Sequence, residues 1–209
     1  MSQGNCQILC WNVRGLNDGA RRDSVHDLVR DTGSTIVCLQ ETKLATIDQG
    51  VIQRTLGTKF LNNFAALPAT QTRGGILLAL SDDHFSLSHV SLSANAITMV
   101  TMKADGLEWW ITVVYGPQTE ADKLIFLQEL KDIAMPAHER WLVLGDFNLI
   151  YQAADKNNMN LNRRLMGSFR ATIDDLRLKE IRLNGRRYTW SNGQDNPMLS
   201  RIDRIFLHN

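Results

Sequence analysis

The sequence predicts an α/β or α+β fold, in which helices and strands pack in layers. Short apolar runs of strand length alternate with amphipathic stretches of helix length, and several consecutive strands occupy the middle of the chain. The chain has 209 residues, of which 44% are hydrophobic, so we expect one domain spanning residues 1–209 with a sizeable core. With 4 proline and 14 glycine residues, the composition excludes a disordered or collagen-like chain.

The strands are predicted from apolar runs rich in β-branched and aromatic residues. In chain order they are Gln7–Val13, Thr35–Gln40, Gly75–Leu80, Phe85–Ser91, Ala96–Lys103, Glu108–Tyr115, Trp141–Gly145, Tyr188–Ser191 and Ile202–Leu207.

The helices are predicted at Arg21–Asp31, Ala121–Met135 and Arg164–Leu176. In the second and third, apolar residues recur three or four positions apart, which gives one apolar stripe along a helix. Pro136 fits a stop just beyond the second helix.

Several classes of protein are excluded. No apolar run approaches the length of a membrane span, and the N-terminus lacks the layout of a signal peptide. The 3 cysteines are odd in number and lack zinc-finger pairing, which argues against a disulfide scaffold or structural zinc. We therefore expect an intracellular protein of the nucleus or cytoplasm that is not secreted and has no membrane partner.

Charge is unevenly distributed along the chain. Residues 163–209 hold ten lysine and arginine residues against five acidic residues, a net charge of +5 in a chain whose total is +1. A C-terminal segment with this excess of positive charge could bind a polyanion. On charge alone, a solvated helix face with a few ion pairs is the favoured interpretation.

Four of the apolar runs end in polar or ionisable residues. Ligands of open sheets bind beyond the carboxyl ends of strands, so these residues are expected to gather on one rim. They are Asn12, Glu41, Tyr115, Asp146 and Asn148.

The residue types on this rim suit phosphoryl chemistry. Mg²⁺ takes one or two carboxylates and keeps several waters, so Glu41 needs no large cage around it. Asparagine amides can contact phosphate, Tyr115 can donate to developing charge, and Asp146 can orient or deprotonate a water. Polar residues also end strands for structural reasons, and Gly-Asp and Tyr-Gly-Pro are typical of turns. For any single position the structural role suffices, whereas five together favour a site.

Five motifs in order carry a resemblance to a known superfamily. They are Ile8–Asn17 (ILCWNVRGLN), Gln40–Lys43 (QETK), Val114–Pro117 (VYGP), Gly145–Asn148 (GDFN) and Ser200–Phe206 (SRIDRIF). Together they resemble the motifs of the endonuclease/exonuclease/phosphatase superfamily, and most closely those of the endonuclease domain of plant LINE-type (non-LTR) retrotransposons. The resemblance covers nearly the whole chain, including Tyr188–Asn192 (YTWSN).

The resemblance implies a four-layer αββα sandwich, made of two mixed β-sheets flanked by helices. It also implies hydrolysis of a DNA phosphodiester with Mg²⁺ or Mn²⁺ as cofactor, in a nick that leaves a 3′-hydroxyl. Carried over by position, Glu41 is the metal ligand with Asn12 beside it, and Tyr115 steadies the scissile phosphate. Asp146 activates the water or protonates the leaving group, and Asn148 orients the phosphate.

The C-terminal quarter supplies the remaining candidates. By resemblance, Asp203 orients a final histidine and Thr189 lies near the DNA strand. The basic residues expected to contact the DNA backbone flank Thr189, and a solvated basic surface is the alternative role for them. They are Arg163, Arg164, Arg186 and Arg187.

One departure from the family leaves the activity open. The family carries a last strand with Ser-Asp-His, and this sequence reaches Asn209 without that motif. We therefore expect the last family strand to be missing and activity to be weak or lost. The alternative function is a catalytically silent nuclease-fold protein, which uses an exposed sheet edge to bind a protein partner or form a homodimer.

Overall fold

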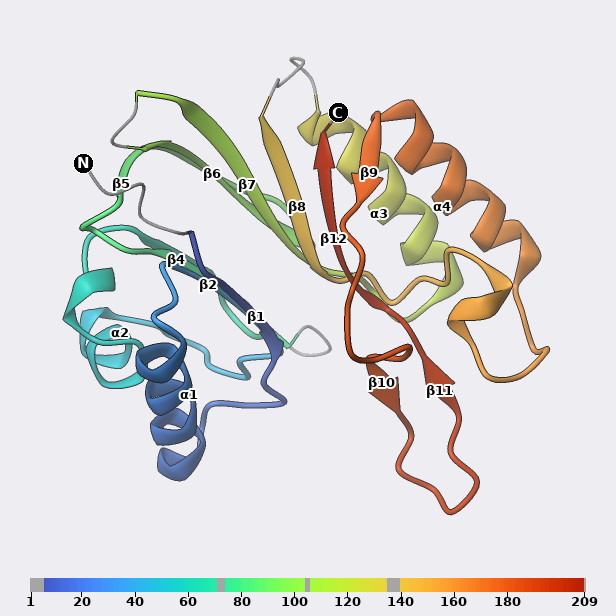
Figure 1. The fold of residues 1–209 in the computed structure, drawn as a ribbon, viewed down its shortest axis with the longest axis horizontal. Helices are drawn as coiled ribbons and strands as arrows, with labels where there is room; N and C mark the ends of the chain where they lie inside the picture. Colours follow the sequence, from blue (N-terminus) through green and yellow to red (C-terminus); the bar gives the residue numbers. More distant parts are fainter. Residues whose placement is uncertain (1–5, 71–73, 104–105, 135–139, 209) are drawn as a thin grey trace. The chain divides into compact units, whose positions relative to one another are not determined.

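Two mixed β-sheets flanked by helices make up the fold, which confirms the α+β class predicted from the sequence. The computed structural model describes residues 6–70, 74–103, 106–134 and 140–208 (Figure 1). These residues fall into two units, Met1–Val114 and Tyr115–Asn209. None of the helices in the described ranges combines the length and apolar character needed to cross a membrane.

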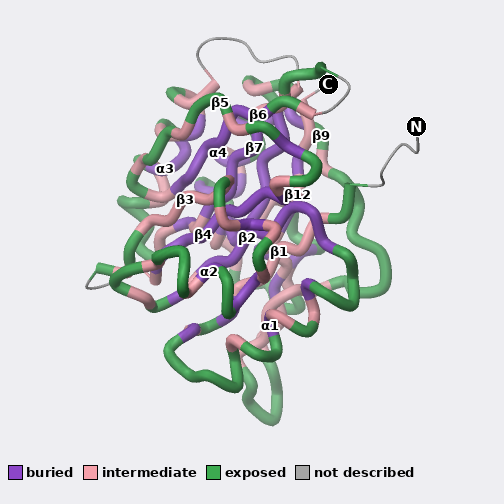
Figure 2. Tube along the Cα trace, turned by 90° about the vertical axis from the view of Figure 1, so that its left-hand side faces the viewer, coloured by how far each residue is buried: buried purple, intermediate pink, exposed green. Residues whose placement is uncertain are grey.

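The first unit contains a four-stranded sheet in the order β1-β2-β4-β3. Its strands are β1 (Ile8–Asn12), β2 (Ile36–Gln40), β4 (Ile76–Leu80) and β3 (Phe64–Leu67). β1 and β2 are parallel, whereas β4 runs antiparallel to both β2 and β3. Every residue of β2 and β4 is buried, so these strands form the inner part of the unit (Figure 2).

One face of this sheet packs against helices α1 (Gly19–Thr32) and α2 (Gln49–Thr55). The Asp18 side chain caps α1 at its start, and Gly33 ends the helix in the left-handed conformation with a φ of 62°. Alternate strand residues share this face with apolar residues of both helices. The cluster includes Val13, Val37, Leu39, Leu77, Ala79, Val25, Val29 and Ile52.

Three consecutive antiparallel strands follow, β5 (Phe85–Leu92), β6 (Ala96–Lys103) and β7 (Glu108–Tyr115); they belong to the first unit except for Tyr115, the last residue of β7, with which the second unit begins. Facing hydroxyls of Thr98 and Thr112 lie 2.8 Å apart and satisfy each other inside the sheet.

In the second unit, strand β12 (Asp203–His208) pairs antiparallel with β8 (Trp141–Asp146) and β9 (Leu178–Glu180). Helices α3 (Glu120–Ile133) and α4 (Arg163–Asp175) lie side by side next to these strands (Figure 1). The Lys131 Nζ and an Asp175 carboxylate oxygen join the two helices at 2.6 Å.

Phe147 lies at the centre of the second unit's core and is fully buried. Its ring centroid lies 6.2, 5.5 and 5.3 Å from those of Phe126, Phe169 and Phe206, so the residue after β8 packs against α3, α4 and β12 at once. This core fixes the backbone between Asp146 and Asn148.

A small hairpin, β10 (Trp190–Ser191) with β11 (Leu199–Ser200), projects from the second unit (Figure 1). The predicted strand Tyr188–Ser191 is therefore shorter than expected.

The predicted strands and helices are confirmed, with ends within two residues of those predicted. Met135, the last residue of the predicted second helix, and Pro136 lie outside the described residues. The sequence reading missed the short elements: α2, β3, β9, β11 and the 3-10 turns Thr58–Phe60 and Ala153–Asp155. Each is too short to show a periodic apolar pattern.

Candidate functional site

Asn12 and Glu41 lie at the same end of the first unit's sheet. β1 and β2 are parallel, and Asn12 is the register partner of Gln40, so Glu41 follows directly at the carboxyl end of the neighbouring strand. The Asn12 Oδ1 accepts a hydrogen bond from the Arg14 amide at 3.2 Å, which turns the chain away from the strand. The structure therefore brings these two predicted residues together.

The backbone around Glu41 adopts a conformation that is costly for these residue types. Glu41, Lys43 and Arg14 have φ values of 56°, 55° and 52°, in the left-handed region. This conformation costs roughly 1–2 kcal/mol for each residue with a Cβ. Such residues concentrate at functional sites, where the surrounding fold holds them in place. Tertiary packing imposes this geometry, so it was invisible in the sequence.

The Glu41 carboxylate is partly accessible, with 22% of its side chain exposed, and the Lys43 Nζ lies 3.1 Å from its Oε1. The carboxylate thus already attracts a cation. Within the described part of the chain, no three His, Cys, Asp or Glu side chains form a group able to hold a metal ion. A single accessible carboxylate with an amide beside it fits Mg²⁺, which keeps most of its waters.

In the second unit, Asp146 and Asp203 are register partners on the antiparallel strands β8 and β12. Cα atoms of such partners lie about 5 Å apart. Asp146 is 3% exposed, and its Oδ1 accepts a hydrogen bond from the Asn148 amide at 3.0 Å. The turn after β8 therefore orients the Asp146 carboxylate.

Gly116 and Asn148 lock the segment after Tyr115 against the turn after β8. The Gly116 amide donates to the Asp146 carbonyl and the Asn148 Nδ2 donates to the Gly116 carbonyl, both at 2.7 Å. Asn148 has a φ of 51°, which asparagine tolerates better than most residues. A Cβ at position 116 would lie 2.6 Å from the Phe147 carbonyl carbon, so only glycine allows this approach. Tyr115, Asp146 and Asn148 are thereby gathered in one place.

Lys123, in the second turn of α3, was missed by the sequence analysis. Burial lowers the pKa of its ammonium, and the negative charges of Asp146 and Glu120 oppose that shift. The helix starts just after Tyr115-Gly116-Pro117, which places a cation where it senses Asp146. The sequence offered one signal for this residue: a lysine one turn into the predicted helix that follows the Tyr115-Gly116-Pro117 motif.

Thr189 supports the strand that carries Asp203. Its Oγ1 accepts hydrogen bonds from the amides of Ile202 at 3.1 Å and Asp203 at 3.2 Å. Its own amide donates to the Ser200 carbonyl at 2.9 Å. Thr189 therefore holds the backbone at Asp203, and the DNA contact predicted for Thr189 stays a prediction.

The four predicted DNA-binding arginines are all exposed in the second unit. Arg163 and Arg164 open α4, where positive side chains are unfavourable for the helix dipole. Arg187 donates from Nε to the Ala154 carbonyl at 3.3 Å and stacks over the Tyr188 ring at 5.3 Å, so it is partly tied to the protein.

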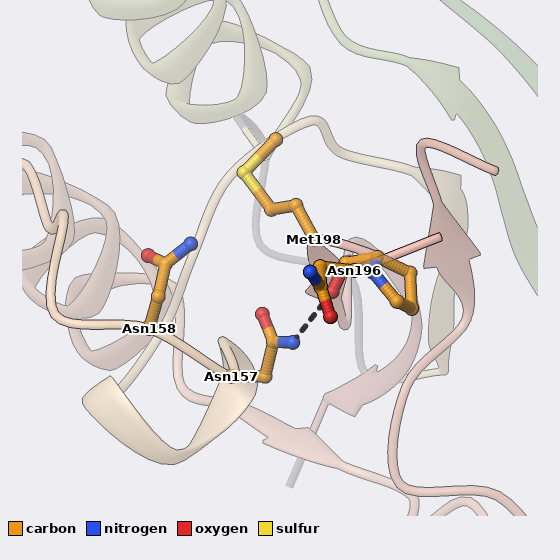
Figure 3. A pocket seen from close by; sticks show the side chains of 5 residues that line it. Asn157, Asn158, Asn196 and Met198 are labelled. Atoms are coloured by element: carbon orange, nitrogen blue, oxygen red, sulfur yellow. Dashed lines mark hydrogen bonds between the residues drawn. The ribbon is translucent and has the colours of Figure 1, made fainter. Parts of the chain in front are cut away.

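A surface hollow of about 390 Å³ lies beside the hairpin in the second unit (Figure 3). The Asn157 Nδ2 donates to the Pro197 carbonyl at 2.8 Å and so ties the hairpin to the loop before α4. No predicted site residue is among the five that line the hollow, which are Asn157, Asn158, Asn196, Pro197 and Met198.

The structure therefore assembles two groups of predicted residues, each within one unit. Asn12 and Glu41 share the end of one sheet, and Tyr115, Asp146, Asn148 and Asp203 surround the turn after β8. The single rim predicted from the sequence includes residues of both units and stays a prediction.

Comparison with known proteins shows which family the chain resembles in sequence. The model of the endonuclease/exonuclease/phosphatase family matches residues 9–209. No curated protein matches the chain by sequence.

Several solved structures have the same fold. The chain is similar to the 3′ phosphatase NExo from Neisseria bound to a product DNA hairpin, with a TM-score of 0.73, 19% identity, and coverage of 97% of this chain and 86% of that one. The endonuclease domain of TRAS1, a telomere-specific non-LTR retrotransposon, gives a TM-score of 0.70 and 12% identity, with 98% and 86% covered. TDP2 from D. rerio with a single-strand DNA product gives 0.67 and 14%, with 98% and 84% covered.

Proposed function

The chain belongs to the endonuclease/exonuclease/phosphatase family, and from this premise we propose that it is an endonuclease that nicks DNA with Mg²⁺ or Mn²⁺. Family and fold together support a phosphodiesterase or nuclease type of function. The observation that carries the proposal is Glu41: a partly exposed carboxylate held in a strained conformation at the end of a buried strand.

Glu41, with Asn12 beside it, would hold the metal ion. Bound there, Mg²⁺ would polarise a phosphate oxygen and stabilise the leaving alkoxide. The Lys43 Nζ lies 3.1 Å from Oε1 of this carboxylate, so a bound ion would share the carboxylate with Lys43 or take its place.

The residues around the turn after β8 would handle the water and the phosphate. Asp146 would orient or deprotonate the attacking water, since Asn148 holds its carboxylate through Oδ1. The Asn148 amide and the Tyr115 phenol would orient the phosphate and donate to its developing charge. Asp203 is the register partner of Asp146, so it would place a second carboxylate beside the phosphate, and Thr189 holds its backbone.

Nicking of supercoiled plasmid with Mg²⁺ or Mn²⁺ tests this proposal. The wild-type chain should nick at least weakly, and Glu41→Ala and Asp146→Asn should each reduce the rate at least about 10²-fold. Asp23→Ala, which removes an exposed carboxylate from α1, is the matched control and should leave the rate unchanged. Absence of metal-dependent nicking, or equal rates in all variants, would contradict the proposal.

Metal binding gives a second readout that does not depend on turnover. Calorimetric titration with Mg²⁺ should show binding that Glu41→Ala weakens by about tenfold or more, because a single carboxylate supplies most of the protein's contribution. An unchanged affinity for Mg²⁺ would mean that a residue other than Glu41 is the metal ligand.

The DNA substrate and the origin of the chain are further parts of the proposal. NExo and TDP2 were solved with DNA, which supports a DNA substrate here. The motif resemblance and the likeness to TRAS1 support descent from a LINE-type retrotransposon. A reverse transcriptase encoded next to this chain in the genome would support that origin, and an ordinary host gene in its place would contradict it.

A second candidate function, protein binding at a sheet edge, is favoured by strand β1. β1 is the outer strand of its sheet and is half-buried along its length, whereas β2 and β4 are fully buried. Outer strands can pair with a strand of another chain. Light scattering that finds a dimer or a stable complex would support this function, and a monomer at all concentrations would contradict self-association.

A further inference from the structure

The chain between α4 and the hairpin carries an unbalanced positive charge. We call residues 177–187 the basic–apolar segment. Its exposed basic residues are Arg177, Lys179, Arg182, Arg186 and Arg187. Its one acidic residue, Glu180, is occupied internally, because its Oε1 lies 2.7 Å from both the Arg201 and the Arg204 guanidinium groups. The segment therefore presents its positive charge outward without compensation.

Two aliphatic side chains are exposed between these basic residues. Ile181 is 48% exposed and Leu183 is 45% exposed, although neither lies in a helix or strand. Single exposed aliphatic residues are common on protein surfaces. Here two exposed aliphatic residues lie only two positions apart, with Arg182 between them and Arg186 and Arg187 shortly after them. The surface therefore combines apolar side chains with side chains that can bind phosphate.

The segment is anchored at both ends. The Ile181 amide donates to the Ile205 carbonyl at 2.8 Å, which continues the pairing of β9 with β12, and Arg187 is tied to the Ala154 carbonyl. Ile205 is two residues from Asp203 on β12, roughly 7 Å along the strand. The Ile181 backbone thus lies beside β12, at a separation along the strand of about two DNA base steps from Asp203.

We propose that the basic–apolar segment binds DNA in two ways: its arginines contact phosphates, and Ile181 with Leu183 insert against the bases and unstack a step. This inference rests on the proposed function, because it assigns a further surface to the same DNA substrate. Proteins that deform DNA use such aliphatic wedges between basic contacts. An anionic membrane fits less well, since the segment is not an amphipathic helix and it adjoins the strand of Asp203.

A duplex that carries 2-aminopurine at successive positions tests the proposal, because the probe brightens when its base unstacks. Wild-type protein with Ca²⁺ in place of Mg²⁺ should raise the fluorescence. Ile181→Ala/Leu183→Ala should abolish the rise, weaken binding about tenfold and keep its salt dependence. Arg186→Ala/Arg187→Ala should instead reduce the slope of log affinity against log salt by about two units. Ile125→Ala, a 65% exposed residue of α3, is the matched control and should behave as the wild type.

The outcomes separate this proposal from the proposed function. No binding to DNA at low salt would count against both. Binding without a fluorescence rise, or a rise that persists in Ile181→Ala/Leu183→Ala, would overturn the proposed insertion of these two side chains. The proposed nuclease function would be unaffected. Tighter binding to phosphatidylserine vesicles than to DNA, lost in the same double variant, would overturn it in favour of a membrane surface.

Discussion

Gly116→Ala is the most direct test of the geometry around Asp146. The added Cβ would lie 2.6 Å from the Phe147 carbonyl carbon and 3.2 Å from the Phe147 Cα. Carbon atoms in contact prefer 3.5–4.0 Å, so one of the two backbones must move by about 1 Å. Phe147 is fully buried between three other phenylalanine rings and has little room to yield.

Overpacking of this kind costs about 1–3 kcal/mol, and the rigid surroundings place Gly116→Ala near the upper end. In a chain of this size, 1 kcal/mol lowers Tm by about 2–4 °C, so we expect a decrease of about 6–12 °C. The hydrogen bonds that Gly116 makes with Asp146 and Asn148 would be displaced as well. Nicking activity should therefore fall more than the loss of folded protein explains.

Gly167→Ala provides the matched control. Gly167 lies inside α4, and nothing would come within 4 Å of its Cβ. Alanine favours a helix over glycine by about 1 kcal/mol, so this variant should raise Tm by about 2–4 °C. Thermal unfolding followed by circular dichroism measures both changes. If Gly116→Ala has the same Tm as the wild type, the close approach of Gly116 to Phe147 is wrong.

Three further predictions concern charge and thiol chemistry. Arg163→Glu should stabilise α4 by about 1 kcal/mol in urea unfolding and also flatten the salt dependence of DNA binding; destabilisation would contradict the dipole argument. Arg204→Ala should cost about 3–5 kcal/mol in the same assay, because it leaves the buried Asp155 carboxylate without its ion-pair partner. Alkylation followed by mass spectrometry should label exposed Cys6 in the native protein and Cys38 only after unfolding, since burial raises the pKa of the Cys38 thiol.

The sequence predicted the long elements of this fold well, because each one carries its own pattern. Strands such as 96–103 and 108–115 are rich in β-branched or aromatic residues, and their observed ends agree with the prediction. The seven-residue helix α2 was missed because it contains a glycine and spans only two turns. Its stability comes from Ile52, which is buried in the cluster beneath the sheet.

The candidate site was predictable only in part. Asn12, Glu41, Asp146 and Asn148 follow apolar runs, so their places at strand ends could be read from the sequence. The proximity of Asp146 to Asp203 could not, because it depends on the register of two strands that are 57 positions apart in the chain. Lys123 likewise became a neighbour of Asp146 only through the placement of α3.

What the sequence by itself determined is therefore the order and type of the main elements, together with the motifs that end them. These depend on near neighbours in the chain, through side-chain alternation and apolar periodicity. Tertiary structure alone decided the left-handed backbone at Glu41, the close approach of Gly116 to Phe147, and the pairing of Asp146 with Asp203. These features arise where packing forces distant segments together, and local preference opposes or ignores them there.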